Sequence, residues 1–304
     1  SVDTSTNTPV SGAYRMGSFM GHVVPGFFFY IFSVWWTWKI FHKFFLCQRA
    51  QDKKGRSRYL NTASFPSNCC TKRVPLESIL KIVAVILGMA GELATAFVDG
   101  KFVYLVNAQH MTMFFFFGLS GVMDLLNHYQ FPFPPDLDYV SAVLAFTMEG
   151  LLFFYHLHGR AGVDVQVHML LFYVICACAV STALEMKYKK NVLPALARTY
   201  FTMLQGTWFL QVGFILYPPV GDKWDEESHR NMMFVTLYFA WHNAAIFIAM
   251  ALTGTLIYFR IKRMDGRNQY HNMVTLSSSM HPNLNKFDAQ QVRNIIADSD
   301  EEEV

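Results

Sequence analysis

Histidine, glutamate and glutamine side chains recur inside the most apolar stretches of this 304-residue chain. Ionisable side chains are costly in a lipid bilayer, so those that occur there usually face a bundle interior or a cavity. When each is placed by depth, at about 1.5 Å per helical residue, most fall in one half of the membrane. This set consists of His22, Glu92, His110, Glu149, His156, His168, Gln205, Gln211 and His242.

Zinc is the cofactor that this set favours, because neutral imidazoles bind zinc well and three protein ligands plus a water form a catalytic site. Glu149 is then the candidate catalytic base. His22, Gln205 and Gln211 are candidates for holding the ligands in place. The hypothesis is zinc binding with hydrolase-like chemistry. Its candidate ligands are Glu92, His110, His156, His168 and His242.

Two other interpretations of the same residues stay open. Facing imidazoles hold a haem if they lie at matching depth, as His156 and His242, or His110 and His168, would have to do. Alternatively, the His and Glu side chains hydrogen-bond across helices and lock the bundle, or line a polar cavity. The chain is then a non-enzymatic carrier, an auxiliary subunit or a trafficking scaffold. No HExxH or paired CxxC spacing decides between an enzyme and a non-enzyme.

The composition is that of an integral membrane protein. Hydrophobic residues make up 53% of the chain and charged residues only 15%, against about a quarter charged in soluble domains. Seven apolar windows are long enough to cross a hydrocarbon core of about 30 Å as helices. We therefore predict an all-α integral membrane bundle of about seven transmembrane helices. The windows lie near 22–45, 77–99, 107–127, 139–158, 166–186, 193–217 and 232–260.

Basic residues predict the orientation of the bundle. Segments 47–76 and 187–192, and the residues after the last window, are rich in Lys and Arg and fall on one side of seven spans. By the positive-inside rule that side is the cytosol. The N-terminus is then outside or lumenal, the C-terminus is cytosolic, and the polar site lies in the outer half. Residues 1–15 are predicted to be a disordered extension, 16–263 the membrane domain, and 264–304 a disordered acidic cytosolic tail.

The inner half carries charges that we expect to lie close to the headgroups. Long side chains near helix ends extend to the membrane surface while their stems stay in lipid. Depth alone therefore predicts exposure, rather than burial, for this second set of ionisable residues. The set consists of Lys81, Asp124, Glu185 and Arg198.

Modification sites and partners are predicted for the segments outside the membrane. The paired Cys69 and Cys70, near a helix end, are candidates for palmitoylation. In the acidic tail, Ser299 is a candidate phosphoacceptor, and the tail is a candidate ligand for a cytosolic protein. Membrane lipids and a membrane-protein partner complete the expected contacts. Nucleic acid is excluded, because the net charge is only +3 and no basic patch is present. The expected location is the plasma membrane or a secretory or endolysosomal membrane.

Several short motifs occur together and in a fixed order. They are Met16–Gly26, Gly88–Glu92, His110–Gly118, His156–Arg160, Val167–His168, Leu204–Phe209, Gln211–Phe214, Leu216–Pro219 and Trp241–His242. With them, residues 16–260 resemble the transmembrane protein 45 family, also called domain of unknown function 716. The resemblance implies a multi-pass membrane protein of about seven helices and implies no particular activity. Its motifs include most of the polar residues selected above by depth.

Overall fold

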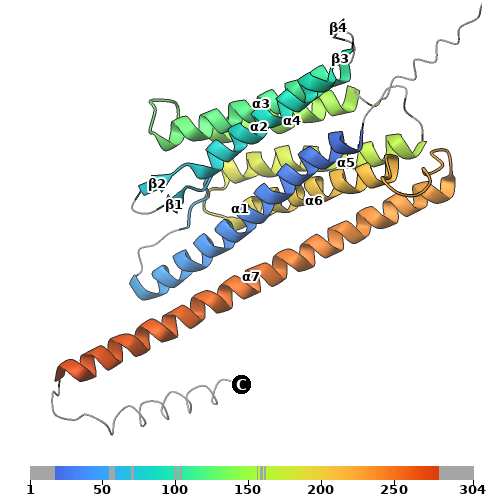
Figure 1. Cartoon of the computed structure of the whole chain (residues 1–304). Coiled ribbons are helices and arrows are strands. Elements are labelled where there is room, and N and C mark those ends of the chain that lie inside the picture. The colour runs from blue at the N-terminus through green and yellow to red at the C-terminus, as the bar shows by residue number, and fades with distance from the viewer. Residues whose placement is uncertain are drawn as a thin grey trace, which may run out of the picture. The chain divides into compact units, whose positions relative to one another are not determined.

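The computed structural model describes residues 18–54, 59–69, 72–98, 101–102, 105–155, 157, 160 and 162–280. Within these ranges it contains seven helices, each overlapping one predicted window, so the predicted all-α membrane bundle is confirmed (Figure 1). Which side of the membrane holds the termini stays a prediction. The helices are α1 (Phe19–Lys54), α2 (Leu76–Thr95), α3 (Leu105–His128), α4 (Leu137–Tyr155), α5 (Gly162–Lys187), α6 (Val192–Leu216) and α7 (His229–Met280).

Five of the helices, α1, α2, α4, α5 and α7, are long and apolar enough to cross a membrane by length and composition alone. The exceptions, α3 and α6, carry more polar residues. In α6 these include Arg198, Thr199, Thr202 and Gln205, all of which are buried. Because the polar face of α6 turns inward, the helix needs less apolar surface to lie in the bilayer.

Two short antiparallel hairpins interrupt the links between helices. In the α1–α2 link, β1 (Ser67–Cys69) pairs with β2 (Lys72–Val74), and in the α2–α3 link, β3 (Phe97–Val98) pairs with β4 (Lys101–Phe102). The two hairpins lie at opposite ends of α2 (Figure 1). The second predicted window ran to residue 99 and so included β3. Neither hairpin was predicted, because strands of two or three residues are too short to show an alternating pattern.

The chain divides into two units, residues 1–255 and 256–304. In the second unit, residues 256–280 continue α7 as a helix. The helix thus extends past the predicted last window into the segment that we expected to be a disordered tail. The predicted N-terminal extension 1–15 and residues 281–304, with the candidate phosphoacceptor Ser299, lie outside the described residues.

Helix packing in the first unit follows a ring-like order. Extensive contact joins α1 to α6, α6 to α5, α5 to α4, α4 to α3, and α3 to α2, whereas α1 and α2 barely touch each other. A core cluster lies between α5 and α6, where the indole N–H of Trp208 donates to the carbonyl of Val167 over 2.9 Å. Val235 and Phe239 of α7 pack against this cluster. The least tightly packed position in the ring is therefore between α1 and α2.

Two glycines allow α1 and α6 to approach each other closely. A Cβ atom on Gly206 would lie 2.6 Å from the backbone nitrogen of Tyr30 and 2.9 Å from the carbonyl oxygen of Gly26. A Cβ atom on Gly26 would in turn lie 2.9 Å from the carbonyl oxygen of Gly206. All three of these close approaches are to backbone atoms, which cannot rotate out of the way. Small residues play this role at helix contacts in membranes, where no water drives the helices together.

Replacing Gly206 with alanine is expected to lower the free energy of unfolding by about 1–3 kcal/mol, the usual cost of inserting a methyl group into packed structure. The measurement is unfolding of the purified protein in mixed detergent micelles. Gly91→Ala is the matched control, because a Cβ atom at Gly91 meets nothing within 4 Å. Equal stability of the two variants would show that the α1–α6 contact is not as close as described.

Candidate functional site

A cavity of about 60 Å³ lies among the ends of the helices at the end of the bundle where α1 begins. That volume is enough for a few waters. We call it the polar chamber. Apolar side chains such as Phe29, Phe114, Phe117, Phe153 and Phe209 form much of its wall. Its polar lining consists of His22, Glu92, His110, Glu149, Arg160 and His168.

Two of the chamber imidazoles are held with their Nε2 atoms available. The Nδ1 atom of His22 lies 2.9 Å from the carbonyl oxygen of Ser18, and that of His168 lies 2.7 Å from Oδ1 of Asp164. Both oxygens only accept hydrogen bonds, so each Nδ1 carries a proton, and in a neutral ring Nε2 then keeps its lone pair. The two rings are 5.7 Å apart, edge to face. The Tyr217 ring is 5.4 Å from His22.

Ion pairs position the other polar groups around the chamber. Nδ1 of His110, on α3, lies 3.1 Å from Oε1 of Glu92, on α2. The guanidinium of Arg160 binds both carboxylate oxygens of Asp164, at 2.9 and 3.0 Å. Thus one guanidinium accompanies three carboxylates, those of Glu92, Glu149 and Asp164, in and beside the chamber.

Glu149 is the buried acidic residue on which the chemistry of the chamber depends. Its side chain lies in the middle of α4 and the residue is only 2% exposed. One oxygen, Oε1, accepts a hydrogen bond of 2.8 Å from the Gln205 amide of α6. The other, Oε2, is buried and has no hydrogen-bond partner among the described residues. A buried acceptor without a donor costs free energy that a bound donor would recover.

His242 and Gln211 lie away from the chamber, although the sequence placed them in the same polar set. They line a separate groove of about 510 Å³ between α1, α6 and α7, where Nδ1 of His242 is 3.3 Å from the Thr207 hydroxyl. The reason is helical phase: six residues separate Gln205 from Gln211, a rotation of about 240° around α6. Counting residues along a helix predicted how deep these side chains lie in the membrane. It could not predict toward which side of the helix they point.

The structure thus brings His22, Glu92, His110, Glu149 and His168 together, as the clustering by depth anticipated. Arg160 was missed as a site residue; its position four residues before Asp164, at the start of α5, was the available signal. Within the described part of the chain, no group of three or more His, Cys, Asp or Glu side chains is arranged to hold a metal ion. The predicted ligand His156 lies outside the described residues, as do Cys70 and the side chain of Cys69.

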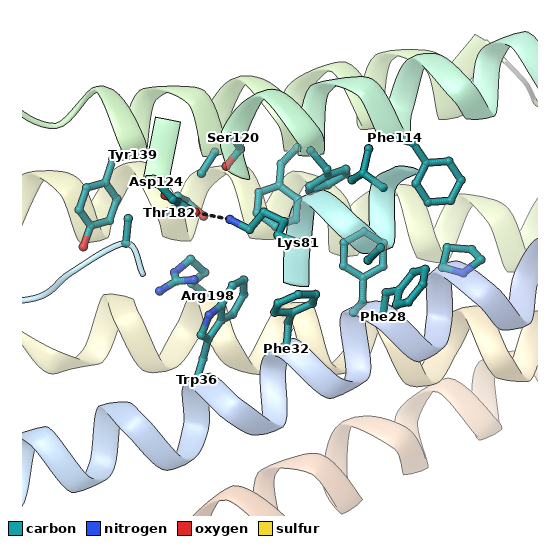
Figure 2. Close-up of a pocket in the computed structure, with 18 residues that line it drawn as sticks. Phe28, Phe32, Trp36, Lys81, Phe114, Ser120, Asp124, Tyr139, Thr182 and Arg198 are labelled. Carbon is teal, nitrogen blue, oxygen red and sulfur yellow. Dashed lines mark hydrogen bonds and ion pairs between the residues drawn. The ribbon is translucent and has the colours of Figure 1, made fainter. Parts of the chain in front are cut away.

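A second, more apolar cavity of about 90 Å³ lies next to the chamber, and we call it the inner cavity. Four residues line both spaces: Pro25, Phe29, Phe114 and Phe117. The Phe29 and Phe117 rings are 5.3 Å apart, edge to face. Figure 2 shows Phe28 and Phe32 of α1 and Phe114 of α3 around this space, with Lys81 and Asp124 farther along it. An aromatic partition of Phe29, Phe114 and Phe117 therefore separates a polar space from an apolar one.

Paired charges close the far end of the inner cavity. Nζ of Lys81 is 2.5 Å from Asp124, and Nε of Arg198 is 2.5 Å from Glu185, which also accepts a hydrogen bond from the Tyr139 hydroxyl. We call these two ion pairs the ion-pair layer. Asp124, Glu185 and Arg198 are each at most 3% exposed. The prediction that these charges extend to the headgroups is therefore wrong, because each found a partner inside the bundle.

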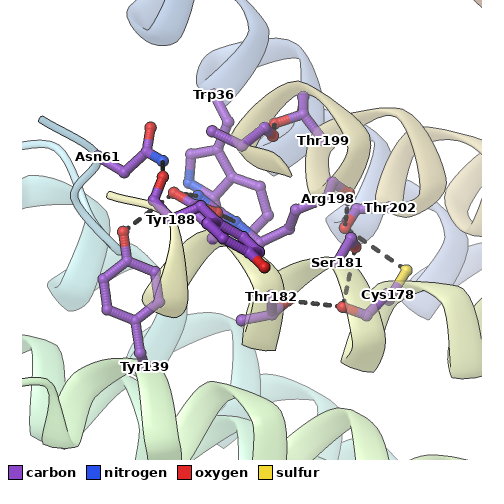
Figure 3. A network of polar contacts seen from close by, with 12 residues as sticks. Trp36, Asn61, Tyr139, Cys178, Ser181, Thr182, Tyr188, Arg198, Thr199 and Thr202 are labelled. Carbon is purple, nitrogen blue, oxygen red and sulfur yellow. Dashed lines mark hydrogen bonds and ion pairs between the residues drawn. The ribbon is translucent and has the colours of Figure 1, made fainter. Parts of the chain in front are cut away.

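Tryptophans and a third carboxylate extend this layer to α1. The guanidinium of Arg198 lies over the Trp36 ring, 4.3 Å from its centre (Figure 3). Glu77, at the start of α2, accepts the indole N–H groups of Trp35 and Trp36, at 3.0 and 2.7 Å, and the backbone N–H of Phe65. These contacts tie α1, α2, α4, α5 and α6 together at the end opposite to the polar chamber.

Comparison with known proteins shows that this chain is similar to one protein family and to several mammalian membrane proteins. Residues 135–258 match the family of unknown function DUF716. Transmembrane epididymal protein 1A of Mus musculus is 26% identical over 234 residues, 75% of this chain and 76% of that protein. Transmembrane epididymal protein 1 of Rattus norvegicus is 27% identical over 243 residues, with the same coverage, 75% and 76%. The Homo sapiens protein of that name is 31% identical over 147 residues, 48% of this chain and 54% of the relative.

Glu185→Leu is expected to lower the free energy of unfolding by about 3–5 kcal/mol, since it leaves the buried Arg198 guanidinium without its counter-ion. The measurement is again unfolding in mixed micelles. The double variant Glu185→Leu with Arg198→Met should recover most of this loss, because an apolar pair of similar volume replaces the ion pair. A double variant no more stable than the single one would contradict the pairing. Glu227→Gln, at an exposed position, is the control.

Proposed function

We propose that this chain, a multi-pass membrane protein that is similar over residues 135–258 to the family of unknown function DUF716, is a carrier whose polar chamber binds a small organic cation. The observation that supports this proposal is the free oxygen of Glu149, buried within the bundle and without a donor among the described residues. An ammonium group supplies both the positive charge and the N–H donors that this oxygen lacks.

The remaining lining agrees with a cationic ligand. His22 and His168 each have Nδ1 directed at an oxygen, and in a neutral ring held in this way Nε2 is an acceptor. The Arg160 guanidinium, which would repel a cation, is bound by the Asp164 carboxylate. The chamber is thus richer in acceptors than in donors. A ligand that donates hydrogen bonds is better matched to it than an anion.

Carriage, rather than binding alone, is supported by the two spaces along the bundle. A carrier opens its binding site to each side of the membrane in turn. Here the polar chamber and the inner cavity are separated by the aromatic partition, and the ion-pair layer closes the far end. Pro25 lines both spaces and, having no N–H, leaves the carbonyl of Gly21 without its usual helical bond. The first helix is therefore locally weakened beside the site.

Methylammonium chloride is expected to raise the melting temperature of the purified protein above the value in sodium chloride of equal ionic strength, because a ligand that binds only the folded state stabilises it. Glu149→Gln should abolish this rise, since a charged hydrogen bond contributes about tenfold or more to affinity. Glu227→Gln should keep it. The measured quantity is the increase in melting temperature that the ligand causes in each variant. A change in the stability of the ligand-free protein does not by itself alter this increase. Equal rises in the wild type and Glu149→Gln would overturn the proposal.

Zinc binding is the second candidate, and it rests on the hydrogen bonds of the imidazoles, since no three described ligands are arranged around a common point. Histidines that bind zinc usually donate their other ring nitrogen to a carboxylate or carbonyl oxygen, as His22, His110 and His168 do here. Hydrolase-like chemistry would then require a water on the metal with Glu149 as its base. The excess of acceptors in the chamber supports either cation.

Elemental analysis of the purified protein separates the two candidates. If the chamber binds an organic cation, zinc should be well below one atom per chain and the same in wild type and His168→Ala. About one zinc per chain, lost in His168→Ala and retained in His229→Ala at the exposed start of α7, would replace the carrier proposal with a zinc site.

A further inference from the structure

We infer that the cation is the head group of an amphipathic amine, with its apolar tail in the inner cavity, and that it reaches the chamber from the bilayer between α1 and α2. This inference rests on the proposed cation site at Glu149 and adds the class of substrate and its route. Three neighbouring spaces carry it: the polar chamber, the inner cavity and an opening on the side of the bundle.

The polar chamber and the inner cavity are placed for a single ligand. Glu149 lines the chamber, while Phe146, one turn earlier on the same face of α4, lines the inner cavity. The two spaces are adjacent, because both are lined by Phe29, Phe114 and Phe117 of the aromatic partition. An ammonium group at Glu149 therefore has the apolar space within about one helical turn.

The inner cavity suits a tail without polar groups. Its lining is largely aromatic and aliphatic and includes Val85, with Phe28 and Phe32 of α1 visible in Figure 2. Its charged residues are all in ion pairs and need no ligand: Lys81 with Asp124 at 2.5 Å, and Arg198 with Glu185 at 2.5 Å. A volume of about 90 Å³ is smaller than a 150 Å³ cavity that holds benzene. The tail is therefore short, a few methylene groups.

A wide opening of about 550 Å³ joins the chamber to the side of the bundle, and we call it the side opening. Its walls come from α1, α2 and α3, at the position where the helix ring is least tightly packed. Apolar residues at its rim include Met20 and Leu87, which are 59% and 62% exposed, as expected for side chains that contact lipid. Deeper inside it are His22, Glu92 and His110 of the chamber.

Phe114 stands where the three spaces meet. It lines the side opening, the polar chamber and the inner cavity, as Pro25 also does. Its ring occupies the space left by the missing side chain of Gly88, where a Cβ atom would lie only 2.6 Å from the ring. Rotation of this one side chain would connect the spaces. A ligand with an apolar tail and a cationic head can use both the lipid-facing rim and the polar interior.

A series of straight-chain primary amines, from methylamine to hexylamine, tests the inference by thermal stability of the full chain in nanodiscs. Apparent affinity should rise about fourfold for each methylene buried and level off once the inner cavity is filled. Hexanoate, which has a similar tail and a negative head, should give no rise. The same series on Glu149→Gln reports partitioning of the amines into lipid.

Filling the inner cavity should remove the gain from the tail and leave the head group unaffected. In Ala142→Leu the hexylamine affinity should fall about tenfold or more while the methylammonium response stays unchanged. Ala84→Leu narrows the same cavity from α2 and serves if the first variant does not fold. Ala90→Leu, at an exposed position of α2, is the matched control.

The outcomes separate this inference from the proposed function. A methylammonium response that does not grow with chain length overturns the amphipathic substrate and leaves the cation site standing. A length dependence that survives both cavity-filling variants, or a hexanoate response equal to that of hexylamine, also overturns it. No response to any amine, methylammonium included, overturns the cation site itself.

Discussion

A charge inside the bilayer must be partnered within the protein, and the polar interior of this bundle follows from that constraint. Arg198 and Glu185, Lys81 and Asp124, and Arg160 and Asp164 each satisfy it in pairs. These pairs join neighbouring helices, or fix the start of α5, and so determine which faces meet. Only one of the two oxygens of Glu149 has a partner, the Gln205 amide. The other oxygen marks Glu149 as a candidate binding group, because the other buried carboxylates among the described residues already have their partners.

The sequence predicted the seven helices and the depth of the site, because both depend on quantities that run along the chain. Apolar length located every helix, and counting residues from the helix ends placed His22, His110 and His168 at one level. Direction around each helix depends on packing, which a single sequence does not display. Hence His242 was grouped with residues that it does not meet. Burial of Arg198 was missed for a related reason, since its partner Glu185 lies on another helix.

The central position of α6 shows why apolar content alone is an incomplete guide to a membrane bundle. Arg198 and Gln205 lower the hydropathy of this helix, yet both are buried and each binds a carboxylate, Glu185 and Glu149 respectively. A helix that contributes as many buried polar side chains as α5 is therefore among the least typical membrane spans by composition. Composition alone does not show how much of a helix faces other helices, because α5 has the hydropathy of a membrane span and still buries several polar side chains.

The close contact between Gly26 and Gly206 gives α1 a fulcrum. On one side of it, about 6 Å along the helix, His22 faces the polar chamber; on the other, about 15 Å away, Trp36 lies against Arg198. A helix held closely at one point moves its two ends in opposite directions when it tilts. Tilting α1 about this contact would widen the bundle at one end while tightening it at the other. The two glycines thus mark the point about which α1 would tilt, with the polar chamber at one end and the ion-pair layer at the other.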